Sequence, residues 1–565
     1  MEHSGIQAFV ELLAQHGVPY LFGNPGTTEL PLNDVLVHDR RVKYLLGLQE
    51  TPVMAMADGY AMASGRIGVV NLHACCGLGN AMGQLYNAFR EGTPLLITAG
   101  QQDRRLALEE PILGGDMVAV TRPWTKWSYE VRSVQELPHA VRRAIKTALT
   151  PPTGPVFLSL PLDVQLEVAA DLDLRPVQLL DGAVRPSVAA VQQASEVLAS
   201  AKNPAILAGS RVTERNAVAE LVSLAERLGA PVYFEAGNTH GRAAFPSDHP
   251  LNAQALPMWS PEIQKRLEPY DALLAVGLDL FRQYLHHAPN QPLPKQAKLV
   301  HLDEDASQLG KNYEFAVGVW GNIKAGLSEL TQQLSGSMTT TARLTAQARG
   351  TAHAARHAEV RQRLRKEIER QRDARPLTPL ALVGALAEVL PANVALVEEA
   401  VTTTNMVFER LGALKNTSGY FGQRGWTLGW GLNCALGVKL AWPDRPVLAM
   451  LGEGAALYGI QGLWTAAHYN IPVTFVICNN AQYGILKIGS RGMQLPAAQS
   501  GQFMAMDLAG PEIDFVALAR SLGVEAHRIT EPQELAERVA ASLAGDRPML
   551  FDVPISRALP DSLDY

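Results

Sequence analysis

The sequence has few cysteines, no excess of basic residues and no long hydrophobic run, and each deficit excludes a class of protein. Its 565 residues include only four cysteines, with no CxxC pair, which excludes a disulfide framework. The 49 Lys and Arg residues are outnumbered by 55 Asp and Glu residues, and the net charge of -6 argues against a nucleic-acid binder. No apolar run reaches the roughly 18 residues of a membrane helix, and the first residues lack the pattern of a secretory leader. We therefore expect a cytoplasmic protein without nucleic-acid or membrane partners.

What is present points to several buried cores. The chain is 47% hydrophobic and 18% charged, and at about 150 residues per domain its length predicts three or four domains. Short β-branched or apolar runs alternate with amphipathic helical stretches, a pattern typical of parallel sheets covered by helices on both faces. The clearest runs are 42–48, 67–74, 94–100, 155–161, 204–209, 272–277, 298–303, 446–452 and 472–480. The sequence thus predicts an α/β fold of doubly wound parallel sheets.

Two changes in composition divide the chain. An acidic, irregular stretch lies near residues 176–186, and a Ser/Thr/Gly segment after residue 335 leads into a highly charged helix without an apolar stripe. Such a helix is typical of a solvated linker rather than a binding surface. We predict domains over residues 1–178, 186–335 and 377–565, with a linker helix over 336–376.

An internal repeat relates the first and last of these domains. A strand through 69–72 leads to CGLGNAMGQLYNAFREGTPLLITAG, and a strand through 447–451 leads to GEGAALYGIQGLWTAAHYNIPVTFVICNN. In each, a glycine-rich turn precedes a helix, and the next strand begins at a proline nine residues after a leucine: Leu85 to Pro94, and Leu463 to Pro472. The shared order predicts two related α/β domains that flank a third.

The strongest chemical motif is Gly452-Glu453-Gly454, followed after 24 residues by Asn479-Asn480. A glycine-rich turn after a buried strand brings backbone N–H groups close to a phosphate. An acidic side chain in that turn can hold a divalent cation that bridges to a diphosphate. The amide oxygen of Asn480 and a backbone carbonyl near Gln482 would complete an oxygen shell. For the glycine pattern alone, a tight turn without a ligand is the alternative.

This motif resembles the thiamin diphosphate motif of the family of 2-oxo acid decarboxylases and acetolactate synthases. In the first domain, similarity to the benzoylformate decarboxylases of that family lies in FGNPGTTELPL (22–32), LQE (48–50), ADGYAMAS (57–64), NLHACCGLGNAMG (71–83), PLLITAGQQDRR (94–105) and KWSYE (126–130). The resemblance implies a pyrimidine-binding, a middle and a diphosphate-binding domain. It also implies an active site between the first domain of one subunit and the third of its partner, hence a homodimer as the minimal unit and a homotetramer as the usual assembly.

The resemblance assigns the main acid–base roles to Glu50 and His73. Glu50 matches the glutamate that hydrogen-bonds the aminopyrimidine of the cofactor, and a carboxyl group in an apolar pocket can exchange a proton with that ring. His73 matches a histidine that transfers protons at the reacting centre, a role that suits imidazole. Without the resemblance, a solvated glutamate and a buried core histidine are the alternatives.

Two further catalytic positions depart from the family pattern. Thr27 replaces a serine after Asn-Pro-Gly and keeps a hydroxyl for the substrate carboxylate, although Thr27 and Thr28 could also cap the following helix. The second histidine of the family follows a Phe-Arg in the middle domain, and LFRQYLHHAP has no clean counterpart. Tyr284 occupies the ungapped position, and His286 or His287 would serve if the loop shifts.

The remaining expected contacts lie in the loops that carry these motifs. Leu428 resembles the bulky residue that bends the cofactor, with core packing as the alternative. The residues expected to contact thiamin diphosphate are Asn24, Pro25, Gly26, Glu50, Thr402, Thr403, Leu428, Gly452, Gly454, Ala455, Asn480, Tyr483 and Gly484. The metal, Mg²⁺ or Ca²⁺, is expected to bind Glu453, Asn480 and Gln482. Glu453 stands where the family usually has Asp, and the extra methylene moves its carboxylate by about 1.5 Å.

These features favour thiamin diphosphate-dependent, non-oxidative decarboxylation of a 2-oxo acid to an aldehyde and CO₂, with benzoylformate as the nearest analogy. Ile485 and Gly489 stand where the aryl-substrate enzymes have a small and a large residue, so the pocket shape differs. One alternative is a carboligase or lyase of the acetolactate synthase or benzaldehyde lyase type. A non-catalytic cofactor-binding homologue is an alternative of another class, against which Glu50 argues. We find no convincing GxGxxG fingerprint of an NAD-dependent dehydrogenase.

Overall fold

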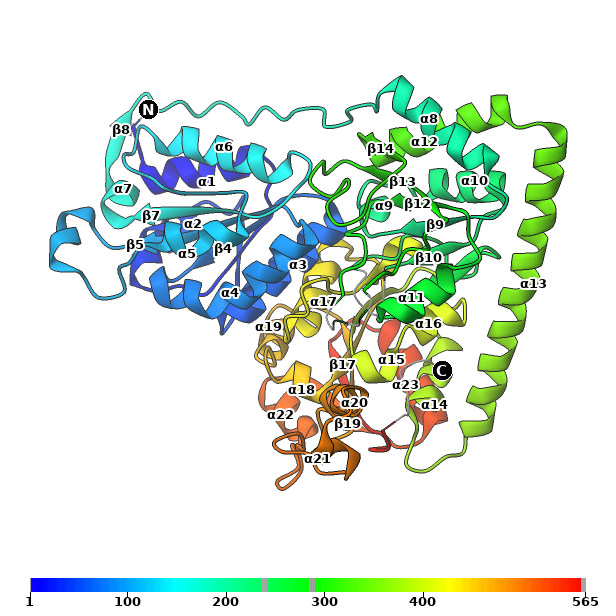
Figure 1. Ribbon diagram of the computed structural model, residues 1–565. Coiled ribbons are helices and arrows are strands. Elements are labelled where there is room, and N and C mark those ends of the chain that lie inside the picture. The colour runs from blue at the N-terminus through cyan, green and yellow to red at the C-terminus, as the bar shows by residue number, and fades with distance from the viewer. Residues whose placement is uncertain (1, 236–240, 284–285, 287, 289, 560–565) are drawn as a thin grey trace.

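Three parallel six-stranded sheets organise the protein, as the computed structural model shows (Figure 1). The structure describes residues 2–235, 241–283, 286, 288 and 290–559. All nine apolar runs singled out in the sequence form strands of these sheets. The prediction of an α/β fold with three doubly wound parallel sheets is therefore confirmed.

The first sheet has the strand order β3-β2-β4-β5-β7-β6. Its strands are β2 (Tyr20–Gly23), β3 (Lys43–Leu46), β4 (Gly68–Leu72), β5 (Leu95–Gln101), β6 (Trp127–Glu130) and β7 (Val156–Pro161). Helices α1 (Gly5–Gln15) and α6 (Leu137–Leu149) cover one face, and α3 (Glu50–Ser64) and α4 (Ala74–Glu91) cover the other. Smaller elements are α2 (Leu30–His38), α5 (Met117–Thr121), α7 (Leu162–Leu166) and the antiparallel pair β1 (Glu2–Ser4) and β8 (Val168–Ala170).

The third sheet repeats this topology, with the order β16-β15-β17-β18-β20-β19. If the strands of each sheet are lettered in chain order, both sheets read b-a-c-d-f-e, in agreement with the internal repeat. The strands are β15 (Ala395–Glu399), β16 (Tyr420–Phe421), β17 (Val447–Gly452), β18 (Thr474–Asn479), β19 (Glu525–Arg528) and β20 (Met549–Pro554). Helices α14 (Pro379–Ala387) and α23 (Pro532–Leu543) cover one face, and α17 (Trp430–Ala441), α19 (Gly462–His468) and α22 (Phe515–Ser521) cover the other.

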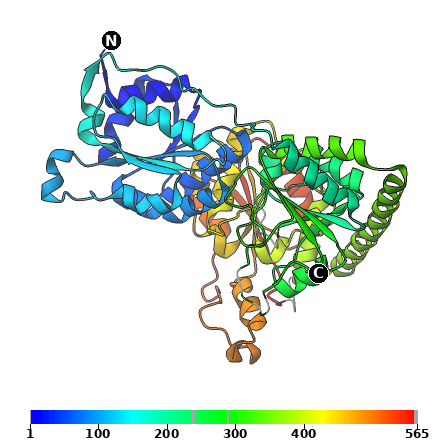
Figure 2. The ribbon, with the colours of Figure 1, turned by 45° about the horizontal axis from the view of Figure 1, so that its top comes forward.

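The middle sheet has a different order, β11-β10-β9-β12-β13-β14. Its strands are β9 (Pro204–Ala208), β10 (Val232–Phe234), β11 (Asn252–Ala255), β12 (Ala272–Val276), β13 (Lys298–Asp303) and β14 (Val317–Trp320). Helices α8 (Val188–Ser200), α10 (Val218–Leu228) and α12 (Ile323–Ser337) pack on one face, and α11 (Ser260–Leu267) packs on the other. The long helix α13 (Thr340–Gln371) then runs along the outer side of this domain (Figures 1 and 2). The exact domain boundaries stay predictions, because the sheets fix only where the strands lie.

The first and third domains share one hydrophobic core, in which α3 packs along α17. Asp58 of α3 is buried there and accepts hydrogen bonds from Trp430 Nε1 at 2.7 Å and Asn87 Nδ2 at 3.3 Å. Burial raises the pKa of Asp58 to about 6. The buried Arg242 of the middle domain donates to backbone carbonyls of both other domains, those of Met62, Ser418 and Tyr420. No helix among the described residues is long and apolar enough to span a membrane.

Candidate active site

Glu50 is a buried carboxyl group at the start of α3, just after β3. Its side chain is held by two amides: Asn24 Nδ2 donates to Oε1 at 3.3 Å, and Asn80 Nδ2 donates to Oε2 at 3.0 Å. Gln49 caps the helix, and a carboxylate in the first turn suits the helix dipole. Only 5% of Glu50 is exposed, so the solvated alternative is wrong. The expected apolar pocket is corrected to one that presents amide donors.

His73 is the N-cap residue of α4, directly after β4, and a buried carboxylate holds its ring. His73 Nδ1 lies 2.8 Å from Glu29 Oε2, and Glu29 is only 1% exposed. Glu29 Oε1 accepts hydrogen bonds from Thr28 Oγ1 at 2.8 Å and from the Gly100 N–H at 2.9 Å. A carboxylate beside Nδ1 places the neutral ring's proton there, which leaves Nε2 as the nitrogen for acid–base chemistry.

The loop after β2 brings these two groups together. Asn24 touches Glu50, and two residues later Gly26 lies against the imidazole of His73. A Cβ atom at Gly26 would lie 2.0 Å from His73 Nδ1, so only glycine fits there without moving the ring. The exposed Pro25 lies between these two contacts. The sequence analysis missed Glu29, whose only signal is an acid two residues after Thr27.

Thr27 and His286 have no described contact with Glu50 or His73. Thr27 is exposed in the short 3-10 helix η1 (Thr27–Glu29), and His286 is exposed in the middle domain. Neither Thr27 nor Thr28 caps the next helix, since the N-cap residue of α2 is Glu29 and makes no side-chain cap bond; the capping alternative is wrong. Two other residues considered for the second histidine, Tyr284 and His287, lie outside the described residues.

The Gly452-Glu453-Gly454 turn lies at the carboxyl end of β17, where Gly452 is the N-cap residue of α18 (Glu453–Ala456). Glu453 is buried, and its Oε1 accepts the Gln482 N–H at 3.0 Å. The same N–H lies 3.1 Å from Asn480 Oδ1. A carboxylate oxygen and an amide oxygen are thus gathered around one N–H, at the ends of the neighbouring strands β17 and β18. Burial raises the pKa of Glu453 above its ordinary value.

This donor set fits a hard divalent cation. The Glu453 carboxylate, the Asn480 amide and the Gln482 carbonyl offer the oxygen ligands that Mg²⁺ takes. The side chain of Gln482 is engaged elsewhere, because its Oε1 accepts from Lys487 Nζ at 2.8 Å and its Nε2 donates to the Arg557 carbonyl at 2.8 Å. Within the described part of the chain, no group of three or more His, Cys, Asp or Glu side chains is placed to hold a metal. Phosphate and water oxygens would therefore have to complete the shell.

The other expected diphosphate contacts surround this turn. Gly454 packs against the ring of Tyr483, where a Cβ atom would lie 2.7 Å from Cε1. Gly484 begins α20 (Gly484–Gly492) and lies beside Asn480 and Thr402. Thr402 belongs to the single-turn helix α15 (Val401–Thr404) after β15. The last two expected residues are the buried Thr403 and the half-buried Ala455.

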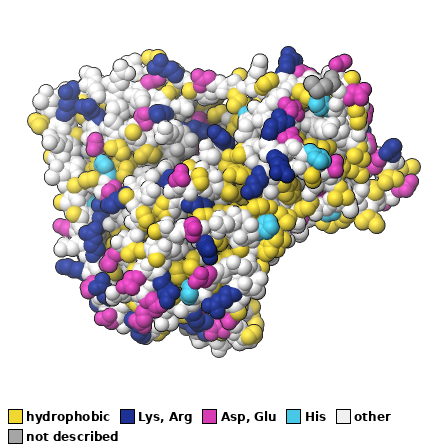
Figure 3. All heavy atoms as spheres, turned by 180° about the vertical axis from the view of Figure 1, so that it is seen from behind, with side chains coloured by type: hydrophobic (Ala, Val, Ile, Leu, Met, Phe, Trp, Pro, Cys, Tyr) yellow, Lys and Arg dark blue, Asp and Glu magenta, His cyan; other side chains and the backbone are white. Residues whose placement is uncertain are grey.

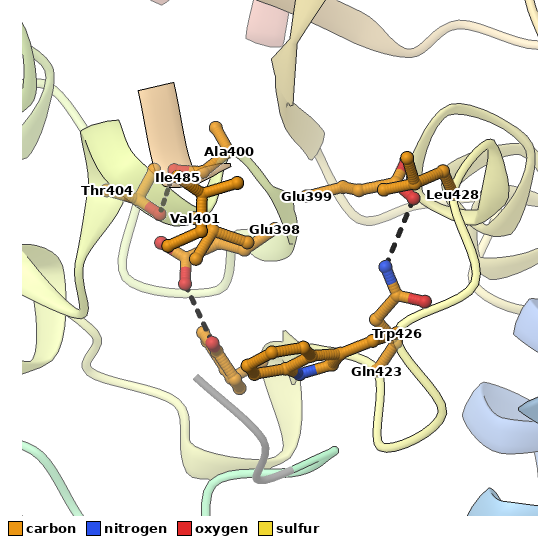
Figure 4. A pocket seen from close by; sticks show the side chains of 10 residues that line it. Glu398, Glu399, Ala400, Val401, Thr404, Gln423, Trp426, Leu428 and Ile485 are labelled. Atoms are coloured by element: carbon orange, nitrogen blue, oxygen red, sulfur yellow. Dashed lines mark hydrogen bonds between the residues drawn. The ribbon is translucent and has the colours of Figure 1, made fainter. Parts of the chain in front are cut away.

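A cavity of about 600 Å³, its open mouth included, lies between β15, the start of α20 and the segment before α17 (Figure 4). Val401, Trp426, Leu428 and Ile485 supply apolar walls. Leu428 is 37% exposed, so the core-packing alternative is wrong. The buried Glu399 also lines the cavity, and accepts hydrogen bonds from the Gln423 side chain at 3.1 Å and the backbone N–H groups of Trp430 at 3.2 Å and Gly431 at 2.9 Å. Burial raises the pKa of Glu399 to about 7.

Helix α4 links the two halves of the site within one chain. Asn80 binds Glu50, and one turn later Gln84 Nε2 donates to the Leu428 carbonyl at 3.1 Å. Thr427 Oγ1 donates to the Gly83 carbonyl at 3.0 Å. Chemically, the arrangement couples a buried carboxyl and an oriented imidazole, suited to proton transfer, to an oxygen-lined turn suited to a metal-bound diphosphate.

Comparisons with known proteins agree with this geometry. Three family models match: the N-terminal TPP binding domain of thiamine pyrophosphate enzymes over residues 3–118, the central domain over 191–330 and the C-terminal TPP binding domain over 400–553. The benzoylformate decarboxylase of Pseudomonas aeruginosa is 34% identical over 98% of this chain and 99% of its own length. An acetolactate synthase large subunit (assigned as probable) of Methanocaldococcus jannaschii is 28% identical over 98% of this chain and 93% of its own.

Solved structures give the same result. The thiamine diphosphate-dependent 4-hydroxybenzoylformate decarboxylase of Rhodococcus jostii RHA1 superimposes with a TM-score of 0.86 at 30% identity, over 99% of this chain and 100% of that chain. The benzoylformate decarboxylase of Polynucleobacter necessarius gives a TM-score of 0.87 at 28% identity, with the same coverage. The chain therefore belongs to the thiamin diphosphate enzyme family and is related to the benzoylformate decarboxylases.

Proposed function

We propose that the protein is a thiamin diphosphate- and Mg²⁺-dependent decarboxylase that converts a 2-oxo acid to an aldehyde and CO₂. The observation that carries this proposal is the pairing of buried Glu50 with the His73–Glu29 couple through the loop 24–26. A protein that only binds the cofactor has no need of two acid–base groups held in this way. The relatives named as benzoylformate and 4-hydroxybenzoylformate decarboxylases support the same reaction class.

Each residue has a definite task in this proposal. When bound, thiamin diphosphate supplies the electron sink for cleavage of the bond to the carboxylate. Glu50 exchanges a proton with the aminopyrimidine, while Asn24 and Asn80 fix the orientation of its carboxyl group. His73 holds or accepts a proton at Nε2, because Glu29 keeps the other ring proton at Nδ1.

The tail of the cofactor is held by the third domain. Glu453, Asn480 and the Gln482 carbonyl bind the metal, and the backbone of 452–455 and 483–484 receives the diphosphate with Thr402 beside it. Leu428 supports the cofactor from the cavity wall. Thr27 and His286 stay proposed contacts of the substrate carboxylate.

We also infer that the working unit is a homodimer, with a tetramer as the further assembly. Apolar side chains on the elements of the site are exposed in the single chain: Leu48 (44%), Leu428 (37%), Tyr458 (56%) and Leu486 (50%). Figure 3 shows hydrophobic side chains across the centre of the face opposite to that of Figure 1. Exposed apolar patches on this scale mark interaction surfaces. A molar mass that stays that of one chain at micromolar concentration would contradict this inference.

The same residues would also support carboligation if a second aldehyde or keto acid reached the site before protonation. The acetolactate synthase relative favours this second candidate, as does Ile485, which narrows the cavity beside Leu428. The two reactions share the cofactor and Glu50 and differ only in their product.

The experiment is a screen of the cofactor-loaded protein. The chain is saturated with thiamin diphosphate and Mg²⁺, binding is checked by calorimetry, and aryl and alkyl 2-oxo acids are tested for release of CO₂ and aldehyde. We expect CO₂ and aldehyde from at least one acid, and their loss in Glu50→Gln. Ligated products without free aldehyde would select the carboligase. With cofactor bound, absence of any product from every acid would contradict both activities.

A further inference from the structure

A second cavity lies on the middle domain, between α11 and α13, and it shares no residue with the candidate active site. It encloses about 930 Å³, part of it open to solvent. Its lining includes Tyr233, Tyr270, Lys265, Arg266, His353 and Arg356. Neither the decarboxylase proposal nor the dimer proposal uses these residues.

A pair of buried tyrosines provides an unused hydrogen-bond donor in this cavity. Tyr233 of β10 is 6% exposed and Tyr270, just before β12, is 4% exposed. Their hydroxyl oxygens lie 2.8 Å apart, and burial raises the pKa of both groups, so both keep their protons. Two hydroxyls that share one hydrogen bond use one proton, and the second has no acceptor among the described residues.

Positive charge converges on the same place. Lys265 and Arg266 come from α11, and Arg356 comes from α13. None of the three forms an ion pair within the described part of the chain, and the charges of Arg266 and Arg356 act on both tyrosine hydroxyls. Burial and the neighbouring cationic side chains lower the pKa of His353 to about 4. Glu262 is the one carboxylate among the described lining residues and leaves an excess of positive charge.

We propose that this cavity is a binding site for a small phosphomonoester, at which Lys265, Arg266 and Arg356 hold the phosphate and the tyrosine pair donates a hydrogen bond to it. Guanidinium groups match phosphate oxygens in charge and geometry. The rings of the tyrosines with Pro257 and Pro269 give the organic part of the ligand an apolar surface. Mononucleotides and sugar phosphates share this chemistry, and the test separates them.

The test is calorimetry on the full chain saturated with thiamin diphosphate and Mg²⁺, so that the diphosphate site is already filled. The probes are AMP, glucose 6-phosphate, inorganic phosphate and citrate. We expect at least one phosphomonoester to bind with a Kd below about 1 mM, more tightly than citrate, and to bind less tightly as salt rises. AMP over glucose 6-phosphate would identify a nucleotide, and the reverse a sugar phosphate.

Variants separate this site from adventitious binding. Arg356→Gln and Tyr270→Phe should each weaken the phosphomonoester at least about tenfold, because each removes a donor from the phosphate. Arg363→Gln, an exposed arginine on the same helix that does not line the cavity, should leave the affinity unchanged. Decarboxylation by the Arg356→Gln enzyme serves as the check of folding. The proposal is overturned if no phosphomonoester binds below about 10 mM, if citrate binds more tightly, or if the Arg356 and Tyr270 variants bind as the unchanged protein does.

Discussion

The first and third domains are the same scaffold used for two kinds of chemistry. Both sheets have the strand order b-a-c-d-f-e, and both present their functional residues at the carboxyl ends of the strands. After strand c, the first domain places His73 and the third places Glu453. After strand b, the first domain places Glu50, and the third places the segment that ends in Leu428. One edge carries groups that move protons, and the other carries groups that hold a charged tail.

The difference lies in how the two edges satisfy their polar groups. In the first domain, side chains satisfy side chains: two asparagines hold Glu50, and Glu29 holds His73. In the third, a backbone N–H satisfies side-chain oxygens: the Gln482 N–H lies between Glu453 and Asn480. A side-chain network fixes a tautomer and an orientation, whereas a backbone turn leaves oxygen lone pairs for a cation.

The largest expected effect comes from Glu50→Gln, which removes the proton of the first edge and leaves the second edge intact. We expect a loss of about 10²- to 10⁴-fold in turnover, the usual contribution of a general acid–base group. Thiamin diphosphate and Mg²⁺ should still bind, since no ligand of the tail is changed. The direct measurement is exchange of the cofactor C2 proton with deuterium, followed by NMR.

A matched control for this variant is Glu167→Gln, at an exposed glutamate of the same domain. It should leave both exchange and turnover unchanged. If Glu50→Gln exchanged the C2 proton as fast as the unchanged protein, Glu50 would have no part in activating the cofactor.

Glu29→Gln should cost less, about 10- to 100-fold in turnover, because it disturbs the orientation of His73 without removing the imidazole. An amide in place of the carboxylate no longer fixes the ring proton at Nδ1. The diagnostic readout is the pH–rate profile, in which the limb assigned to His73 should shift. A reduced rate with an unchanged profile would mean that Glu29 acts only in folding.

The third domain is tested by Glu453→Gln, which replaces the carboxylate of the metal turn by an amide. Since even indirect partners of a metal commonly contribute 10- to 100-fold to affinity, we expect the Mg²⁺ needed for half-maximal cofactor binding to rise at least about tenfold. Saturating Mg²⁺ should restore much of the turnover, in contrast to Glu50→Gln. Unchanged Mg²⁺ dependence would place the metal elsewhere.

The smallest expected effect concerns the shared core between the two domains. The pKa of Asp58 is raised from 3.8 to about 6 and that of Glu399 from 4.5 to about 7. The folded state therefore binds these protons more tightly than the unfolded chain, so the free energy of unfolding falls as pH rises from about 4 through 7 and levels off above that range. For Asp58 the change is about 3 kcal/mol at most.

Asp58→Asn keeps an oxygen acceptor for Trp430 and removes the titration. Urea midpoints at a series of pH values and one protein concentration should decline less steeply for this variant than for the unchanged protein. Equal slopes would show that Asp58 is already ionised in the folded state at low pH.

The sequence was sufficient for features that depend on local pattern. Nine apolar runs gave nine strands, the repeat around Leu85 and Leu463 indicated the shared topology, and Glu453 and Asn480 were expected beside one another because they follow neighbouring strands. These inferences need only periodicity, turn residues and the rule that parallel strands end at one edge.

The features that were missed depend on burial and on contacts between distant segments. Glu29 looks like a surface residue at the start of a helix, yet its acceptors face His73 and Gly100, which are 44 and 71 residues away. The amide partners of Glu50 come from two different loops, so its pocket could not be inferred from LQE. Leu428 looked equally like a core residue until its exposure into the cavity was seen.

The central claim is that the two edges work together across two copies of the chain, and mixed dimers test it most directly. One chain carries Glu50→Gln and the other carries Glu453→Gln with Asn480→Ala, and the mixed species is purified through two different tags. Intersubunit sites predict that one site of the mixed dimer combines two unaltered edges, so it recovers about half the turnover of the unchanged dimer while both parent dimers remain inactive. A mixed dimer as inactive as its parents would contradict the claim, because each site would then be built within a single chain.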